Sequence, residues 1–315
     1  MASRFHAACM CESKHVGENT EVAAFAHVFA GAQIGKACRI GEHVVIENDV
    51  VIGDRVTIEA GAQLRDGARI EDDVFVGPNV VLVNDAFPRS GKKPDIRSTT
   101  SVGTGASIGA NATILAGVSI GRNAMVGAGA VVVRSVPPNA VVAGNPARIL
   151  RYVESARHAQ EVTPLRDLSK KAERVIPTAV PGVKIHRTPL ILDLRGNLTA
   201  GELADALPFV PKRYFMVFDV PSAHVRGEHA HRRCHQFLIC ASGQCAVVVD
   251  DGKNRQEIEL SSPSVGLHLP PMIWATQYKY SREATLLVFA SESYDPSDYI
   301  RDYDEFVRDA AARGV

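Results

Sequence analysis

The chain has 315 residues, a length that corresponds as a prior to about two domains. Hydrophobic residues make up 46% of it and charged residues 22%, so its composition excludes intrinsic disorder. Basic and acidic side chains both number 35, so no overall charge would attract nucleic acid or an anionic membrane. No run reaches the roughly 18 apolar residues of a membrane span. We therefore expect a folded protein that binds neither nucleic acid nor a membrane.

The cellular location is predicted from the N-terminus and the cysteines. The first residues lack the apolar segment of about 7–15 residues that a secretory signal contains. The six cysteines are too few for a disulfide scaffold in a chain of this length. We therefore predict a reduced, cytoplasmic protein.

The first half of the chain carries an internal repeat in which an aliphatic residue recurs every six positions. This period fits neither an α-helix, with about 3.6 residues per turn, nor a long strand, with a period of about 2. It fits short strands separated by turns and grouped into coils that stack about 4.8 Å apart. The repeat predicts a mainly β protein that begins with a parallel β-helix. The repeated positions are Val16, Val22, Val28, Ile34, Ile40, Ile46, Ile52, Ile58, Leu64, Ile70, Val76 and Leu82, then Val102, Ile108, Ile114, Ile120, Val126 and Val132.

The interruption of the repeat falls between Leu82 and Val102. It is polar and rich in proline and glycine, so it cannot stay in the wall of the β-helix and must leave as a loop. Long loops on a rigid scaffold often carry function. We therefore expect this loop to contribute to a functional site.

The residues around this loop resemble a known family. Residues 46–50 and 71–80, the segment Asn84–Ser90 and the closing segment Ala143–Arg148 are similar to hexapeptide N-acetyltransferases that act on nucleotide-linked 3-amino sugars. The resemblance implies a left-handed β-helix over residues 12–150, acetyl-CoA as cosubstrate and a coenzyme groove between neighbouring prisms. A groove shared in this way requires at least a homo-trimer.

The same resemblance implies roles for individual residues. Asn84 would orient the sugar amine, and Asp85 would accept a proton or fix the sugar hydroxyls. The alternative is that Asn84 and Asp85 only start a turn, because both residue types bond local backbone groups. His27 and Arg89 would contact the sugar nucleotide. Coenzyme A would lie along Gly127, Gly129, Gly144, Asn145, Pro146 and Arg148, with backbone amides near Gly127 and Gly129 facing the thioester arm.

The pattern changes after Arg148. Residues 151–184 are charged, partly helical in period and interrupted by proline, which indicates a connector. Over residues 185–315, short strands rich in β-branched and aromatic residues are separated by Gly, Pro and Asp-Gly turns and followed by a terminal helix. This pattern predicts a β-barrel or sandwich.

The centre of this second domain is the motif Arg226-Gly-Glu-His229-Ala-His231. His-x-His on a strand points both imidazoles to one face. Metal-dependent cupins join such a pair to a Glu and to a third His on a later strand. Here Gln236 occupies the Glu position, and residues 270–276 contain no His. We therefore predict no metal, and a histidine pair without a metal favours proton chemistry.

These motifs resemble the WxcM-type sugar 3,4-ketoisomerases, which are jelly-roll cupins acting on dTDP-4-keto-6-deoxyglucose. The resemblance implies that His229 and His231 are the acid/base residues that move a proton from C3 to C4. Arg226 would bind the pyrophosphate or polarise the ketone. Gln236 and Trp274 would also contact the substrate.

Together the two halves predict a bifunctional enzyme. The cupin would isomerise the 4-keto sugar, a separate aminotransferase would aminate the 3-keto product, and the β-helix would acetylate the new amine to give dTDP-Fuc3NAc or dTDP-Qui3NAc. The alternative is an acetyltransferase whose cupin only binds dTDP-linked deoxy sugars. Because cupins of this kind commonly pair through strands, we expect a homo-trimer or a hexamer of two trimers.

Overall fold

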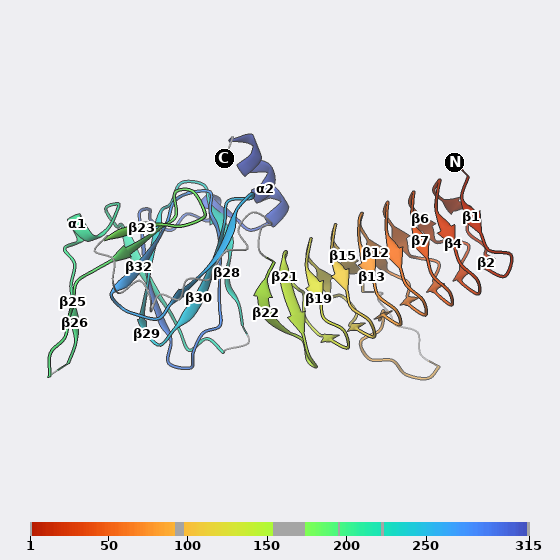
Figure 1. Cartoon of the computed structure of the whole chain (residues 1–315), viewed down its shortest axis with the longest axis horizontal. Coiled ribbons are helices and arrows are strands. Elements are labelled where there is room, and N and C mark those ends of the chain that lie inside the picture. Colours follow the sequence, from red (N-terminus) through yellow and green to blue (C-terminus); the bar gives the residue numbers. More distant parts are fainter. Residues whose placement is uncertain (1, 92–97, 154–173, 195, 222–223, 314–315) are drawn as a thin grey trace. The chain divides into compact units, whose positions relative to one another are not determined.

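The computed structural model describes residues 2–91, 98–153, 174–194, 196–221 and 224–313. The chain forms two compact units, Met1–Val153 and Glu154–Val315 (Figure 1). Most of the partly helical segment expected in the connector falls on residues 154–173, which lie outside the described ranges. Within those ranges, no helix is long and apolar enough to cross a membrane.

The first unit is a parallel β-helix, as predicted, in which successive short strands are distributed over three sheets (Figure 1). The nine-stranded sheet contains β1 (Arg4–Phe5), β4 (Glu21–Val22), β7 (Arg39–Ile40), β10 (Thr57–Ile58), β13 (Phe75–Val76), β16 (Ser107–Ile108), β19 (Met125–Val126), β21 (Ala140–Ala143) and β22 (Arg148–Tyr152). The seven-stranded sheet contains β2 (Met10–Cys11), β5 (His27–Val28), β8 (Val45–Ile46), β11 (Gln63–Leu64), β14 (Val81–Leu82), β17 (Thr113–Ile114) and β20 (Val131–Val132). The six-stranded sheet contains β3 (His15–Val16), β6 (Gln33–Ile34), β9 (Val51–Ile52), β12 (Ala68–Ile70), β15 (Thr100–Val102) and β18 (Ser119–Ile120).

The interior of the β-helix confirms the six-residue repeat. The repeated aliphatic side chains from Val22 to Val132 are all at most 4% exposed, whereas Val16 is half-buried. Each such side chain contributes about 1.5–3 kcal/mol when it is fully removed from water. The predicted loop is also present, because β14 ends at Leu82 and β15 begins at Thr100. Stacking of the wall continues across the loop, since Ile70 of β12 pairs with Val102 of β15.

The β-helix begins at Arg4, before the expected start at residue 12. β1 and β2 pair with β4 and β5, in a register that places Phe5 beside Val22 and Cys11 beside Val28. Cys11 precedes Val16 by five residues instead of six. The six-residue period therefore fails at this point of the sequence, although the stacking does not.

Glycine after an aliphatic residue is required by the close approach of successive coils. A Cβ atom on Gly35 would lie 2.3 Å from the carbonyl oxygen of Gly53 in the next coil. The backbone of Gly35 is not in the left-handed region, so the reason is space and not conformational freedom.

The second unit is a sandwich of two sheets whose neighbouring strands pair antiparallel, as expected for a jelly-roll cupin. The six-stranded sheet has the order β23 (Val175–Pro177), β24 (Lys184–Arg187), β32 (Val265–Leu269), β29 (Gln236–Ser242), β34 (Thr285–Ala290), β27 (Arg213–Phe218). The five-stranded sheet has the order β31 (Arg255–Leu260), β30 (Cys245–Asp250), β33 (Trp274–Tyr278), β28 (Arg226–His231), β35 (Tyr299–Ile300). The other elements are the hairpin of β25 (Leu190–Ile191) and β26 (Leu198–Thr199), the helices α1 (Leu203–Ala206) and α2 (Tyr303–Ala312), and the 3₁₀ helix η2 (Pro296–Asp298).

Two apolar clusters stabilise the cupin. The larger fills the space between the two sheets and includes Leu238, Val247, Leu267 and Leu286, all completely buried. The smaller lies between the five-stranded sheet and α2 and is centred on Phe306. The inner and outer faces of β28 are therefore both covered, and alternate residues of this strand face different environments.

Candidate active sites

The histidine pair of the cupin lies on the inner face of β28. Ala230 belongs to the outer cluster beneath α2. His229 and His231 flank Ala230, so they point to the opposite face, toward the barrel interior. His229 pairs with Ala275, which belongs to the inner cluster, at a β-bulge beside Gly227. The two imidazole centroids lie 5.0 Å apart, so the predicted juxtaposition is present.

His229 is a neutral imidazole whose two ring nitrogens have different surroundings. Its Nδ1 lies 2.8 Å from the carbonyl oxygen of Gly227. A carbonyl only accepts, so Nδ1 carries the proton and Nε2 carries the lone pair. Among the residues that the structure describes, none forms a hydrogen bond with this Nε2. Burial lowers the pKa of His229 to about 4, so the lone pair is available as a base at neutral pH.

His231, by contrast, has both ring nitrogens engaged. Its Nδ1 lies 2.9 Å from Oδ2 of Asp298, and its Nε2 lies 3.0 Å from Nε2 of Gln236. A carboxylate accepts the Nδ1 proton, so the amide of Gln236 donates to the lone pair of Nε2. Burial lowers the pKa of His231, and the Asp298 carboxylate partly opposes this shift. The arrangement holds His231 in one tautomer and orientation.

Asp298 was not anticipated from the sequence. It lies in η2 and is only 3% exposed. Besides His231, its carboxylate accepts hydrogen bonds from the backbone N–H groups of Arg233, at 2.8 Å, and Cys234, at 3.3 Å. It therefore ties the turn after β28 to the segment before α2 while it orients the imidazole.

The other predicted cupin residues fall in different places. Arg226 is exposed at the start of β28, opposite Gln277. Gln236 is buried against His231, as described above. The structure corrects the expectation for Trp274. Its ring contacts Tyr303 and Phe306 in the outer cluster, on the face of the sheet opposite to the histidine pair.

Three potential metal ligands lie near this site. Ligand atoms of His231, Cys234 and Asp298 lie within 4.8 Å of one another, and all three residues are buried. Nδ1 of His231 already forms a hydrogen bond with Asp298, and the Cys234 sulfur lies 3.3 Å from the carbonyl oxygen of His235. The absence of a metal stays a prediction.

In the β-helix, Asn84 and Asp85 stand half-buried just after β14, where the loop leaves the wall. Oδ1 of Asp85 accepts a hydrogen bond of 2.8 Å from the backbone N–H of Phe87, so this residue does form the turn considered as an alternative. Its second carboxylate oxygen is not used in that turn. Arg89 is exposed, and its guanidinium donates to the carbonyl of its neighbour Pro88.

His27 stands on β5, in the same sheet as β14. Its Nε2 lies 3.1 Å from Oε1 of Glu12, and its ring stacks on Phe29 at a centroid distance of 4.1 Å. These contacts fix the orientation of the imidazole at the surface of the β-helix.

The structure corrects the role expected for the amides of Gly127 and Gly129. Both N–H groups already donate within the wall, to Val142 at 2.7 Å and to Ala110 at 2.8 Å. They are therefore not free to face a thioester. Gly144, Asn145 and Pro146 lie in the connection from β21 to β22, and Arg148 is the first residue of β22. The carbonyl of Gly144 accepts from the backbone N–H of Val131 in β20.

Fold and site together define a class of protein, a hexapeptide-repeat β-helix of the transferase type joined to a cupin with an inward-facing histidine pair. Residues 181–311 match the family described as WxcM-like, C-terminal. Residues 49–84 and 99–134 match the bacterial transferase hexapeptide family, and residues 31–65 match the hexapeptide repeat of succinyl-transferase.

Individual relatives agree with these matches. The cupin half is 44% identical over 123 residues to the TDP-4-oxo-6-deoxy-alpha-D-glucose-3,4-oxoisomerase of Aneurinibacillus thermoaerophilus, covering 39% of this chain and 88% of the relative. The β-helix half is 52% identical over 148 residues to the dTDP-3-amino-3,6-dideoxy-alpha-D-galactopyranose 3-N-acetyltransferase of the same organism, covering 47% of this chain and 77% of the relative. The chain therefore belongs to the WxcM-like 3,4-oxoisomerases through its cupin and to the hexapeptide-repeat N-acetyltransferases through its β-helix.

A solved structure gives a further comparison. It is a mutant perosamine N-acetyltransferase from Caulobacter crescentus in complex with CoA and GDP-perosamine. This chain is 29% identical to it, with 42% of this chain and 56% of that chain covered and a TM-score of 0.37.

Proposed function

We propose that this chain catalyses two steps that flank an amination. The cupin converts dTDP-4-keto-6-deoxyglucose to the 3-keto isomer, and the β-helix transfers an acetyl group from acetyl-CoA to the 3-amino sugar nucleotide made from it. The observation that carries the first step is the unprotonated Nε2 of His229 inside the barrel, to which no described residue forms a hydrogen bond. The N-acetyltransferase relative, at 52% identity, supports the second step.

The isomerisation requires a base but no external oxidant or reductant. His229 Nε2 takes the proton from C3, and the electron pair moves into a C3–C4 double bond while negative charge develops on O4. A proton is then delivered to C4, O3 gives up its proton as the C3 ketone forms, and O4 becomes a hydroxyl. His231 cannot accept a proton at Nε2 without displacing Gln236, so it positions and polarises while His229 moves the proton.

Acetyl transfer requires a neutral amine beside a thioester. The amine nitrogen attacks the thioester carbonyl, the C–N bond forms, the C–S bond breaks, and the amine proton passes to the thiolate. Asn84 would orient the amine through its side-chain oxygen. The carboxylate oxygen of Asp85 outside the turn would accept the proton or fix a sugar hydroxyl.

The position of these residues on the prism supports an assembly. Asn84 follows β14 of the seven-stranded sheet, whereas Gly127 and Gly129 follow β19 of the nine-stranded sheet. In one chain these are different corners of the prism, so a groove lined by both requires two chains. We propose a homo-trimer, and a stable monomer with full transferase activity in analytical ultracentrifugation would contradict it.

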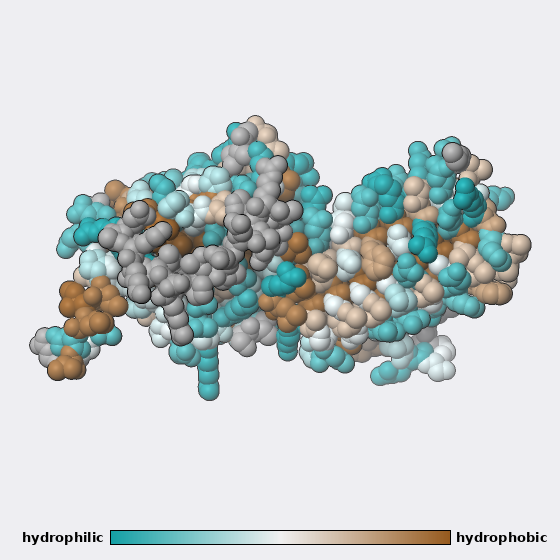
Figure 2. Space-filling model, viewed as in Figure 1, coloured by the Kyte–Doolittle hydropathy of each residue, from teal (hydrophilic) through white to brown (hydrophobic). Residues whose placement is uncertain are grey.

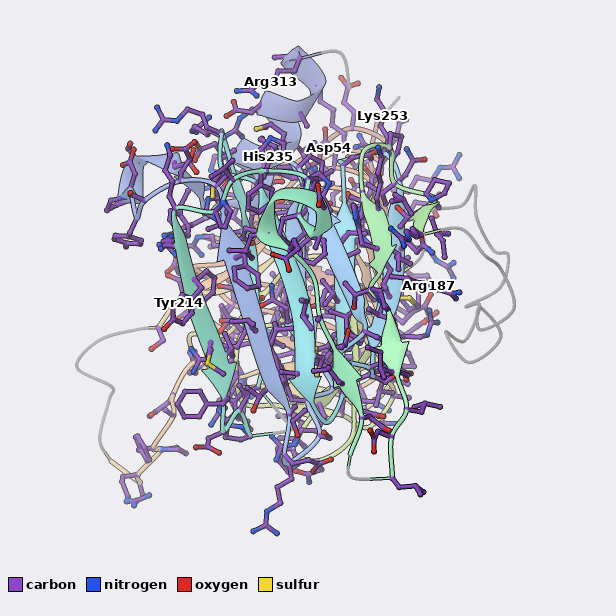
Figure 3. The ribbon with its side chains drawn as sticks, turned by 90° about the vertical axis from the view of Figure 1, so that its left-hand side faces the viewer. Asp54, Arg187, Tyr214, His235, Lys253 and Arg313 are labelled. Atoms are coloured by element: carbon purple, nitrogen blue, oxygen red, sulfur yellow. The ribbon has the colours of Figure 1, made fainter. Side chains whose placement is uncertain are left out.

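Exposed apolar side chains support the pairing of two such trimers through their cupins. β27 is the edge strand of its sheet, and its outward residues Tyr214, Met216 and Phe218 are 69%, 47% and 60% exposed. Tyr214 is labelled at this edge in Figure 3. The hairpin of β25 and β26 adds a second apolar surface (Figure 2), with Ile191 53% exposed. Large exposed apolar patches mark interaction sites, which favours a hexamer.

The acceptor is proposed from the acetyltransferase relative, which acts on a galacto-configured 3-amino sugar. The cupin would then deliver the galacto 3-keto sugar, and a separate aminotransferase would install the amine. NMR of the product formed from dTDP-4-keto-6-deoxyglucose tests this assignment. A gluco configuration at C4 would overturn it.

The decisive experiment is a reciprocal pair of variants assayed on both reactions. His229→Asn should lower isomerisation by about 10²–10⁴-fold and leave acetylation of a supplied 3-amino sugar nucleotide unchanged. Asn84→Ala should do the reverse. The control is His235→Asn, because the His235 ring stacks on His268 at a centroid distance of 5.3 Å and is not part of the pair on β28.

One assay also separates catalysis from mere binding by the cupin. A base that removes the C3 proton exchanges it with solvent, so incubation in deuterated water should label the substrate or product. A cupin that only binds the sugar nucleotide causes no such exchange. Absence of both exchange and product with the parent protein would refute the isomerase proposal.

A further inference from the structure

A cationic side chain that the sequence did not suggest lies beside the histidine pair. Arg213 is the first residue of β27, on the same side of the strand as Phe215, which packs against the inner cluster. Arg213 pairs with Ala290 of β34, and Ala290 pairs with Gln236 of β29. Directly opposite residues share a face of the sheet, so Arg213 and Gln236 both face the barrel interior.

No carboxylate among the described residues compensates the charge of the Arg213 guanidinium. In the described part of the chain it forms no ion pair, and its Nε is buried without a hydrogen-bond partner. Its one hydrogen bond there runs from Nη2 to the hydroxyl of Tyr299, at 3.2 Å. The rings of Phe215 and Tyr294 each lie 5.4 Å from its central carbon. An unpaired, partly buried cation is costly, so this position favours an anion supplied from outside the chain.

Tyr299 connects this cation to the proposed base. Its ring centroid lies 4.3 Å from that of His231 and 4.9 Å from that of His229. The guanidinium of Arg301 lies 4.6 Å from the centre of the same ring. Because the Tyr299 oxygen accepts from Arg213, its own proton remains available to a further acceptor. The hydroxyl is thus a polarised donor close to the imidazole that would remove the proton.

We propose that Arg213 and Tyr299 form the electrophilic half of the isomerase site and hold the oxyanion of the enediolate. This inference depends on the isomerisation proposed above. When His229 removes the C3 proton, negative charge appears on O4, and the Tyr299 hydroxyl donates to it while Arg213 supplies positive charge. The same pair then holds O3 as the C3 ketone forms. Bonds from charged donors are the stronger class, and such groups act most in a water-poor site.

The competing role for Arg213 is to bind the diphosphate of the substrate. Both roles place an anion beside the guanidinium, but they differ in kinetics. A diphosphate contact is made equally in the ground and transition states, so its loss raises KM with kcat unchanged. An oxyanion contact is made only in the transition state, so its loss lowers kcat.

The test uses Tyr299→Phe and Arg213→Lys in the full chain, with kcat, KM and dTDP affinity measured for each. Tyr299→Phe removes only the hydroxyl and keeps the ring against both imidazoles. It should lower kcat and the rate of C3 deuterium exchange together by about 10²–10³-fold, with KM and dTDP affinity within about threefold of the parent. Arg213→Lys keeps the charge but loses the fork that reaches the tyrosine, so it should lower kcat in the same way.

Tyr214→Phe is the matched control, because Tyr214 lies beside Arg213 in the sequence but faces outward and is 69% exposed. It should behave as the parent. Parent-like kcat for Tyr299→Phe overturns the inference, as does an Arg213→Lys variant that changes only KM and dTDP affinity. A parent protein that does not isomerise at all refutes the proposed function instead, so the two failures are distinguishable.

Discussion

Replacing Asp298 with Asn tests how the site fixes the protonation of His231. The carboxylate accepts from Arg233 N–H on one oxygen and from His231 Nδ1 and Cys234 N–H on the other. An amide has one accepting oxygen, so its NH₂ group must face donors on one side. If the amide oxygen of the substituted side chain stays with the Arg233 N–H, its NH₂ group faces Nδ1 of His231. His231 then either loses this hydrogen bond or changes to the tautomer with the proton on Nε2. In that tautomer the Nε2–H points at the NH₂ group of Gln236.

The expected loss of stability follows from the burial of His231 and Asp298. The side chains of His231 and Asp298 are 6% and 4% exposed, so solvent does not replace the lost contact. A hydrogen bond to a charged group contributes about 1.5–3 kcal/mol. We expect Asp298→Asn to lower the free energy of unfolding of the cupin by about 2–3 kcal/mol, which corresponds to a fall in Tm of about 5–10 °C. Isomerase kcat should fall by about 10²-fold or more, because the imidazole no longer has one orientation.

The assay compares Asp298→Asn with Asp295→Asn by urea unfolding and by isomerase kinetics below the unfolding temperature. Asp295 belongs to the same turn and pairs with Arg233 at 2.8 Å, but its side chain is 41% exposed and does not contact the imidazole. Because this ion pair is exposed to solvent, its loss should lower the stability much less than Asp298→Asn does, and it should spare kcat. Equal effects of the two variants on kcat would refute the reasoning, and so would parent-like kinetics for Asp298→Asn.

Three further predictions concern the pH dependence of stability, the packing of the β-helix and the need for a metal. The pKa values of His229 and His268 are lowered to about 4 by burial, so as pH falls below about 6.5 the unfolded chain takes up protons that the folded chain does not. Urea unfolding at pH 5.5 should therefore give a stability about 2–3 kcal/mol below that at pH 7.5, and His268→Asn should reduce this difference. Gly35→Ala should lower the Tm of the β-helix, since forced overpacking costs about 1–3 kcal/mol. Gly91→Ala has no described heavy atom within 4 Å of the new Cβ, so it should cost only the strain of its left-handed backbone (φ +72°), about 1 kcal/mol. Prolonged treatment with a chelator should leave both activities unchanged, and loss of either on metal removal would contradict the predicted absence of a metal.

Most of the β-helix could be predicted because its signal is repeated. One aliphatic side chain per six residues fills the interior from Val22 to Val132, and each repeat reinforces the others. The first coil was not predicted, because Cys11 and Val16 are five residues apart instead of six. The expectation for the amides of Gly127 and Gly129 was wrong because a stacked coil uses its backbone N–H groups to bond the coils on either side of it.

The cupin site was only half predictable, because its two sides come from distant parts of the sequence. His229 and His231 form a local motif whose alternation on a strand fixes their common face. Asp298 follows His231 by 67 residues and reaches it only through the pairing of β35 with β28. Arg213 depends on the register across β27, β34 and β29. The role expected for Trp274 was wrong because successive residues of a strand face opposite sides of the sheet. Trp274 faces the outer cluster, and its neighbour Ala275 faces the inner one.

The reversal of chain direction at β22 has a consequence for how the solenoid ends. In a stack of parallel strands, the free edge of each coil offers backbone N–H and C=O groups with which a further parallel coil can pair. β22 pairs antiparallel with β21 and becomes the last strand of the nine-stranded sheet. Its outer edge offers the wrong direction to an incoming coil, and its exposed Arg148 and Arg151 place like charges where two such ends would meet. The strand thus ends the parallel stack with an edge on which a further parallel coil does not fit, which disfavours end-to-end stacking of neighbouring molecules.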